Sequence, residues 1–138
     1  MTESPISAGD EARIVSVAMD LAREGKTSEL RAFLEHAFPV DARDAQGNTL
    51  LMLAAYHGHS DTVDALISHG ADVDLPNDRN QSPISGAIFK GEEQVVRALV
   101  AAGADLDFGS PSARETAAMF GRAGLLDPPA DDPDSEQA

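Results

Sequence analysis

Short apolar stretches alternate with polar segments along the middle of the chain. Residues 49–56 read TLLMLAAY and predict a short, buried helix that ends before a His-Gly pair. A second helix is expected from about residue 60 to residue 69, because Val63, Leu66 and Ile67 recur at helical spacing on one face. Gly70 should end this helix, since the residue after a helix commonly adopts a left-handed conformation that costs glycine little.

The polar residues around these two helices predict how the helices begin and connect. Ser60 and Asp61 stand where an N-cap residue and a first-turn acid belong. Residues 41–48 are polar, and Gly47 favours a turn, so this segment should project as a tight hairpin-like loop. A helix pair of this size cannot cover its own apolar face. The pattern therefore predicts one unit of a stacked array.

The same pattern returns every 33 residues. This period lies in the range that is typical of stacked repeat architectures. The recurrence is plainest in the glycines Gly25, Gly58, Gly91 and Gly124, and in the pairs Val40-Asp41, Val73-Asp74 and Leu106-Asp107.

The second period resembles the ankyrin repeat. The residues that carry the resemblance are Asp44, Gly47, the run from Thr49 to Ala55, Gly58-His59, Leu66-Ile67 and the run from Gly70 to Asp74. Residues 77–107 are a looser copy, residues 14–39 a degenerate first copy, and residues 112–126 hold one helix and little of its partner. The resemblance implies an all-α solenoid of helix-turn-helix units with hairpin-like loops, built from three repeats and a C-terminal half-repeat cap.

We expect the chain to be organised around one repeat domain. Residues 1–10 should be a flexible N-terminus, residues 11–126 the domain, and residues 127–138 a disordered acidic tail. The repeats are expected at about residues 11–39, 40–72, 73–105 and 106–126. A longer helix over residues 11–24 suits an N-terminal cap. After Ser112, a last helix should turn Thr116, Ala117, Met119 and Phe120 towards the array.

Two departures from the family pattern affect the expected loops and packing. Ankyrin repeats usually carry a histidine as the fourth residue of the first helix, where it links adjacent loops. Met52 and Ser85 stand there instead, which predicts less rigid loops. Gly86 falls inside the first helix of the third repeat, at a cost of about 1 kcal/mol relative to alanine. It indicates either tight helix packing or a close approach by a ligand.

Composition narrows the classes of function. The formal net charge is −14, which disfavours nucleic acid and membrane surfaces as partners. No cysteine is present, so disulfides, thiolate chemistry and sulfur-ligated zinc are excluded. The sequence holds no nucleophile elbow and no glycine-rich phosphate loop, and the four histidines are better explained as structural. We therefore expect no enzyme, no cofactor and no metal.

The expected compartment is the cytoplasm. The first residues lack a basic stretch followed by an apolar run, and no segment reaches the roughly 18 apolar residues of a membrane span.

With these functions excluded, we expect the chain to act through a surface that binds another protein. The resemblance implies that loop tips and the exposed side of the first helices form a concave face for a protein partner of unknown identity, bound by a monomer. The residues expected on this face are Arg23, Gln46, Asn48, Tyr56, His57, Asp78, Arg79, Gln81, Phe89 and Lys90.

Four of these residues are the main candidates for partner contacts. Tyr56 and Phe89 are one period apart, so stacking should place them side by side. They either anchor a partner or fold back over the core. Arg79 and Lys90 are expected to form a small basic and aromatic island that could hold a carboxylate. Alternatively, neighbouring acids neutralise both cations.

The acidic balance supports an alternative function. The chain could inhibit or chaperone a basic or nucleic-acid-binding protein through its acidic surface and its tail, which carries Asp127, Asp131, Asp132, Asp134 and Glu136.

Overall fold

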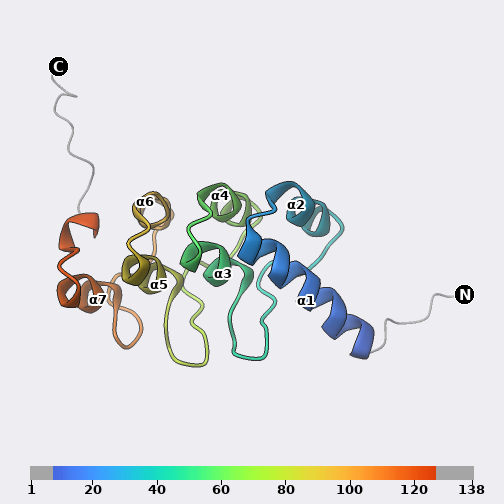
Figure 1. The fold of residues 1–138 in the computed structure, drawn as a ribbon, viewed down its shortest axis with the longest axis horizontal. Helices are drawn as coiled ribbons and strands as arrows, with labels where there is room; N and C mark the ends of the chain where they lie inside the picture. Colours follow the sequence, from blue (N-terminus) through green and yellow to red (C-terminus); the bar gives the residue numbers. More distant parts are fainter. Residues whose placement is uncertain (1–7, 127–138) are drawn as a thin grey trace, which may run out of the picture.

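The computed structural model describes residues 8–126, and these residues form an elongated stack of helix pairs (Figure 1). The elements, in chain order, are α1 (Ala8–Glu24), α2 (Thr27–Glu35), α3 (Leu50–Tyr56), α4 (Ser60–Ser68), α5 (Pro83–Lys90), α6 (Glu93–Ala101), α7 (Ala113–Met119) and the 3₁₀ helix η1 (Ala123–Leu126). This part of the chain contains no β-strand. The predicted all-α solenoid, with three helix pairs and a half-repeat cap, is confirmed.

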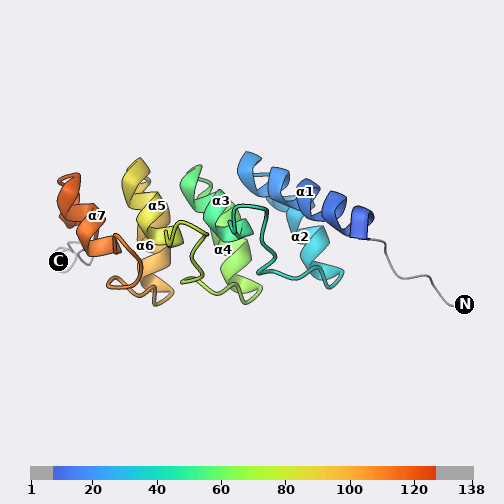
Figure 2. The same cartoon turned by 90° about the horizontal axis from the view of Figure 1, so that it is seen from below.

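The helices form two rows. The first helices α1, α3, α5 and α7 pack against one another in sequence order, and α2, α4, α6 and η1 form the second row. The loops that precede α3, α5 and α7 hang from the same side of the first row (Figure 1). The view from below has the same order of helix pairs along the long axis (Figure 2). First helices and loop tips therefore share one face of the stack.

The core lies between the two rows and runs through the whole stack. Val63 and Leu66 are fully buried and Ile67 is partly buried, as their helical spacing predicts. The largest fully buried apolar side chains come from the five helices α2 to α6: Leu30, Leu50, Leu51, Leu66, Ile84, Ile88, Leu99, Val63, Val95 and Val96. Because these residues lie in successive repeats, the core is continuous.

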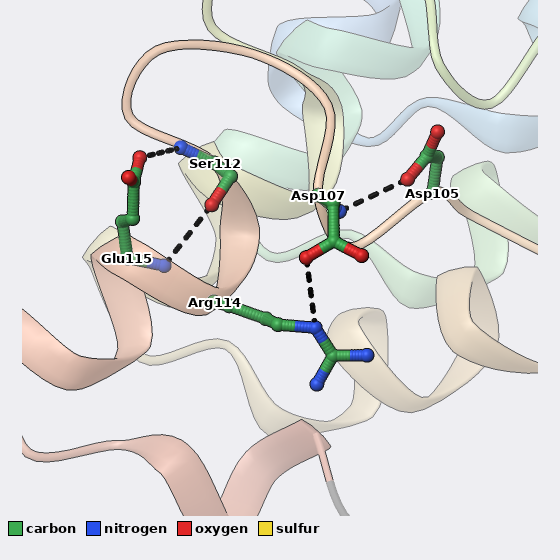
Figure 3. Close-up of polar contacts among 5 residues, drawn as sticks. All are labelled: Asp105, Asp107, Ser112, Arg114 and Glu115. Carbon is green, nitrogen blue, oxygen red and sulfur yellow. Dashed lines mark hydrogen bonds and ion pairs between the residues drawn. The ribbon is translucent and has the colours of Figure 1, made fainter.

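Side-chain caps fix where the first helices start. The Oγ1 atom of Thr49 accepts a hydrogen bond from the Met52 amide at 3.0 Å. Ser112 begins α7 with a capping box, in which its hydroxyl accepts from the amide of Glu115 and the Glu115 carboxylate accepts from the amide of Ser112 (Figure 3). The same close-up includes Arg114, which pairs with Asp107 at 3.0 Å across the loop before α7.

The expected N-cap at Ser60 is wrong. Helix α4 is preceded by His59, whose side chain makes no capping bond, and Ser60 is already helical. Its hydroxyl donates instead to the side-chain oxygen of Gln94 in the next repeat, at 3.5 Å. Asp61 does lie in the first turn, where its charge favours the helix dipole.

The loops are connected to one another despite the missing family histidine. Gly47 has a φ of 77°, which allows the hairpin-like turn. The amide of Asp78 donates to the carbonyl of Gln46 at 3.0 Å, and the side chain of Asn77 donates to the Asn48 side-chain oxygen at the same distance. These bonds join the loop before α3 to the loop before α5, although neither Met52 nor Ser85 is the histidine that usually links the loops.

Both ends of the stack differ in detail from expectation. Helix α1 begins at Ala8, before the expected start at residue 11, because a single glycine such as Gly9 costs too little to stop a helix. In α7, Thr116 and Ala117 are buried as predicted, but Met119 is 62% exposed and Phe120 is 45% exposed. Met119 lies on the flank of this short helix and Phe120 follows its last residue, so both side chains miss the buried face.

The two terminal segments lie outside the described residues. The flexible N-terminus was expected over residues 1–10, of which residues 8–10 belong to α1. For residues 1–7, and for the acidic tail expected over residues 127–138, the expectation stays a prediction. Over residues 8–126, none of the helices combines the length and the apolarity needed to cross a membrane.

Candidate protein-binding groove

A groove of about 430 Å³ opens on the face that first helices and loops share. Eight of the ten predicted site residues line it: Arg23, Gln46, Asn48, Tyr56, His57, Arg79, Gln81 and Phe89. Asp44, Met52, Leu53 and Asn77 complete the wall. We refer to this set of twelve residues as the concave groove. The 33-residue period thus brings residues from three repeats to one hollow.

The other two predicted residues lie beside the concave groove rather than in its wall. Asp78 is exposed in the third-repeat loop, and its carboxylate packs against Gly47, where it leaves no room for a β-carbon. Lys90 is exposed at the end of α5, and its Nζ lies 5.0 Å from the centre of the Tyr56 ring. Lys90 therefore covers one edge of the groove with a cation–π contact.

Aromatic rings form a continuous row on this face. The rings of Tyr56 and Phe89 are stacked, with centroids 6.4 Å apart and planes 12° from parallel. Phe89 is 45% exposed, and it meets Phe120 edge-on at 5.2 Å. The predicted pairing of Tyr56 with Phe89 is thus present in the structure. Phe120 was missed because the residue one period after Phe89 is Arg122, so the period does not mark it.

The cations at the groove have few acidic neighbours. Among residues 8–126, neither Arg79 nor Lys90 forms an ion pair, so Asp78 and Glu92 do not neutralise them through direct contacts. Arg23 is different, because its guanidinium pairs with Asp20 one turn earlier on α1.

The one carboxylate in the groove wall is committed to its own loop. Oδ1 of Asp44 accepts hydrogen bonds from the amides of Gln46 and Asn48, both at 2.9 Å. This is the local side-chain-to-backbone bonding that aspartate commonly makes in turns. Asp44 therefore shapes the loop tip and leaves the cations across the groove unpaired.

Asn77 holds the polar side of the groove. Its Oδ1 accepts from the amides of Arg79 and Gln81, and its Nδ2 donates to the side-chain oxygens of Asn48 and Gln81, all within 2.9–3.1 Å. Asn77 is 8% exposed, so it acts as an internal brace. Sequence reasoning missed it, although an Asn two residues before a cationic loop tip is a frequent turn former.

The two histidines of the second repeat have separate surroundings. The ring of His59 donates from Nε2 to the carbonyl of Arg23 at 2.8 Å, which is a structural role. Partial burial lowers the pKa of His57, the positive charges of His59, Arg23 and Lys90 lower it further, and Glu92 opposes them. In the described part of the chain, no group of three or more potential ligands from His, Cys, Asp and Glu is placed to hold a metal ion.

The unusual glycine of α5 is explained by packing. A β-carbon at Gly86 would lie 2.8 Å from Cε of Met52 and 3.4 Å from Cδ1 of Tyr56. The glycine thus allows α3 and α5 to approach closely, and this places the Tyr56 ring beside Phe89. Of the two interpretations given above, tight helix packing accounts for Gly86.

A larger hollow of about 750 Å³ lies at the N-terminal end, between α1 and the end of α2. Its wall is mainly apolar and includes Ile14, Val15, Phe33 and Phe38. None of the predicted site residues lines it.

Comparison with known proteins agrees with this architecture. The family described as ankyrin repeats, in three copies, matches residues 17–110. An ankyrin repeat protein of Pseudomonas aeruginosa is 41% identical over 61 residues, which cover 43% of this chain and 36% of that protein. The chain thus matches about a third of the relative's length. The family match covers well over half of the chain, and the chain belongs to the ankyrin-repeat family.

Proposed function

We propose that this chain is a non-enzymatic protein–protein interaction module, a small adaptor or regulator that binds a partner protein in the concave groove. The observation that carries the proposal is the stacked pair of partly buried Tyr56 and exposed Phe89 beside Arg79 and Lys90, two cations without ion-pair partners in residues 8–126. Tyrosine and arginine are enriched among the residues that dominate binding energy at protein interfaces.

The rigidity of the groove supports the same function. Asn77 and Asp44 hold the loop tips through hydrogen bonds to backbone amides, and Gly86 fixes the distance between α3 and α5. A surface that is ordered before binding loses less conformational entropy when a partner arrives. The groove therefore needs little reorganisation to accept a protein segment.

Affinity capture with a triple variant tests the proposal. The tagged wild type and Tyr56→Ala/Arg79→Ala/Phe89→Ala are used to capture proteins from cells, and each captured protein is quantified by mass spectrometry. The matched control changes three exposed residues of the second row, Arg31→Ala/Asp64→Ala/Gln94→Ala. Circular dichroism checks that all three chains are folded. We expect the groove variant to lose the partner and the control to retain it.

Equal recovery by the wild type and a folded groove variant would show that the partner binds elsewhere. A deletion of residues 128–138 separates this function from the acidic alternative. Recovery should be unchanged by the deletion if the groove binds the partner. Loss of recovery, together with steep weakening by salt, would instead support binding through the acidic tail.

A further inference from the structure

We propose that the concave groove selects an acidic segment of its partner, one that carries a large apolar side chain among its carboxylates. The inference rests on the proposed function and adds the chemistry of the partner. Two independent features of the groove lead to it: the sign of its charge and the exposed aromatic row.

The helices behind the groove lack the acidity of the rest of the chain. The whole protein carries 24 acidic residues against 10 basic ones, yet neither α3 nor α5 contains an acid. The only charged residue of these two helices is Lys90. By contrast, α4 and α6 carry Asp61, Asp64 and Glu93 on the opposite row. The surface of α3 and α5 therefore presents no helical carboxylate that would repel an anionic segment.

Arg79 and Lys90 can each donate hydrogen bonds to a ligand. The guanidinium of Arg79 and the ammonium of Lys90 have no carboxylate partner within residues 8–126. Asp44, the acid in the groove wall, already accepts two amide hydrogen bonds. Arginine can bind a carboxylate through two parallel hydrogen bonds, and lysine binds one as a point charge. The groove can thus receive carboxylates at two places.

The lowered pKa of His57 also indicates that positive charges outweigh negative ones near this residue. Burial lowers its pKa most, the positive charges of His59, Arg23 and Lys90 lower it further, and within residues 8–126 only the charge of Glu92 opposes them. A carboxylate that enters the groove would stabilise the protonated form of His57, so binding would raise this pKa. Protonation of His57 and binding of an acidic segment are therefore coupled.

The aromatic row determines the apolar part of the proposed ligand. Phe89 and Phe120 are each 45% exposed and touch edge-on, while Tyr56 continues the row below Lys90. An aliphatic or aromatic side chain laid on these rings would remove apolar surface from water. A purely acidic chain would leave this surface exposed, so the segment should combine both kinds of residue.

A nucleic acid fits this surface poorly. Its phosphates are densely spaced, and a strand long enough to cross the face would also meet Asp20, Asp78 and the net charge of −14. A protein segment with a few carboxylates avoids this repulsion because only its central residues need to be acidic.

Binding of defined peptides to the full chain tests the inference. The probe is a fluorescein-labelled peptide of glutamate and aspartate with one central phenylalanine. One control peptide replaces every acid by its amide, and another replaces the phenylalanine by alanine. Fluorescence anisotropy should give an affinity for the probe about tenfold tighter than for either control, which corresponds to about 1.4 kcal/mol. Equal affinity for the probe and its amide control would overturn the inference.

Charge variants of the protein locate the binding. Arg79→Gln/Lys90→Gln should weaken the acidic probe about tenfold and leave the amide control unchanged. Arg31→Gln/Arg114→Gln is the matched control, because both residues are exposed away from the groove. If the control pair weakens the probe as much as the groove pair does, net charge alone explains binding and the inference fails.

Amide chemical shifts identify the occupant. In ¹⁵N-labelled full-length protein, the probe should shift the amides of Phe89, Lys90 and Arg79. Neutralising the acids of residues 127–138 by Asn and Gln should leave these amides unshifted in the absence of probe. Shifts caused by that change alone would mean that the chain's own acidic segment occupies the groove, and a partner segment would be excluded.

The outcomes separate this inference from the proposed function. If Tyr56→Ala/Phe89→Ala abolishes capture of a partner protein but Arg79→Gln/Lys90→Gln does not, the groove binds a protein and the acidic specificity is wrong. If neither pair affects capture, the proposed function itself is wrong.

Discussion

The turn between α1 and α2 and the turn between α3 and α4 begin at equivalent glycines but are closed by different side chains. At the first turn, the ring of His59 packs against Gly25 and donates to the carbonyl of Arg23 at 2.8 Å. At the second turn, Glu92 packs against Gly58, and a carboxylate has no proton to donate. Each glycine has a positive φ, a backbone conformation that favours glycine over residues with a β-carbon. A β-carbon would also lie under 3.0 Å from the side chain that packs there, so that His59 or Glu92 would have to move.

The two turns therefore differ in whether a side chain donates a hydrogen bond to the carbonyl group at the end of the first helix. The carbonyl of Tyr56 is one period after that of Arg23, and no side chain of residues 8–126 donates to it. The turn after α5 again has a donor, because Nη1 of Arg122 reaches the carbonyls of Ile88 and Phe89 at 2.9 and 2.6 Å. The outer two turns are therefore closed by donors and the middle one is not.

The middle turn is thus held by fewer side-chain hydrogen bonds from the described residues than the turns on either side of it. The carboxylate of Glu92 lies beside the end of α3, where a negative charge opposes the helix dipole, but Glu92 also precedes α6, where the same charge favours the dipole. Arg122 places a positive charge at the end of α5, where it is favourable. The middle turn contributes two residues to the groove wall, Tyr56 and His57, whereas the ends of α1 and α5 contribute one each, Arg23 and Phe89. The helix end whose carbonyl has no side-chain donor in residues 8–126 thus lies at the proposed binding surface.

Arg122→Ala should have the largest effect on stability. It removes two charge-assisted hydrogen bonds to the last turn of α5, so the free energy of unfolding should fall by about 2 kcal/mol. Urea denaturation followed by circular dichroism measures the change. Arg114→Ala is the control, because its ion pair with Asp107 is well exposed and should contribute under about 1 kcal/mol. Equal losses for both variants would contradict the role assigned to Arg122.

His59→Ala should have the next largest effect. The variant loses the bond to the Arg23 carbonyl and the ring that packs against Gly25, so unfolding should become easier by about 1 kcal/mol. The comparison is with His36→Ala, whose ring is exposed and bonds only within its own helix. If both substitutions have the same effect in urea, the closing role of His59 is wrong.

Glu92→His should make the middle turn resemble the first. A donor beside Gly58 could reach the Tyr56 carbonyl, so this chain should be more stable than Glu92→Ala by roughly 0.5–1 kcal/mol. Both variants lose the acid beside the end of α3 and before α6, so the dipole effects cancel in the comparison. Glu92→Ala removes the acid without adding a donor. The difference between the two variants therefore reports the hydrogen bond. Equal stability of the two variants would indicate that the donor is not used.

The fold and most of the groove could be predicted because both follow the 33-residue period. Glycines at the turns, Thr49 as a cap and the paired rings of Tyr56 and Phe89 recur in register, and stacking carries that register into space. Asp44 also marked its loop, since an Asp before a Gly commonly bonds to its own turn.

Two kinds of feature could not be predicted: those of residues that do not follow the 33-residue period, and contacts that long side chains make with a neighbouring repeat. Arg122 follows Gly121 as His59 follows Gly58 and Glu92 follows Gly91, but it lies 30 residues after Glu92, so the 33-residue period does not mark it. Phe120 joins the aromatic row two residues before the expected place. Met119 was expected to face the array, but it lies on the flank of α7, away from the face that buries Ala113, Thr116 and Ala117. Ser60 was expected to cap α4 and instead reaches a residue of the next repeat.

The smallest expected effect is a dependence of stability on pH through His57. Burial and the nearby charges of His59, Arg23 and Lys90 lower its pKa in the folded chain below the ordinary value of about 6.5, and Glu92 partly offsets them. The unfolded chain therefore binds more protons as the pH falls below about 6.5, and stability contributed by His57 is lost in that range. Above it, both states are neutral at this residue and the slope should vanish.

Titration of the ring by proton NMR should give a pKa for His57 below the ordinary histidine value of about 6.5, and Glu92→Gln should lower it further because the charge of Glu92 raises it. In urea, the wild type should lose slightly more stability than His57→Gln between about pH 7 and pH 5.5. Identical pH profiles for the two chains would mean that His57 feels no net cationic field. The middle turn would then differ from the first only in its missing donor, and the proposed preference of the groove for carboxylates would lose one of its supports.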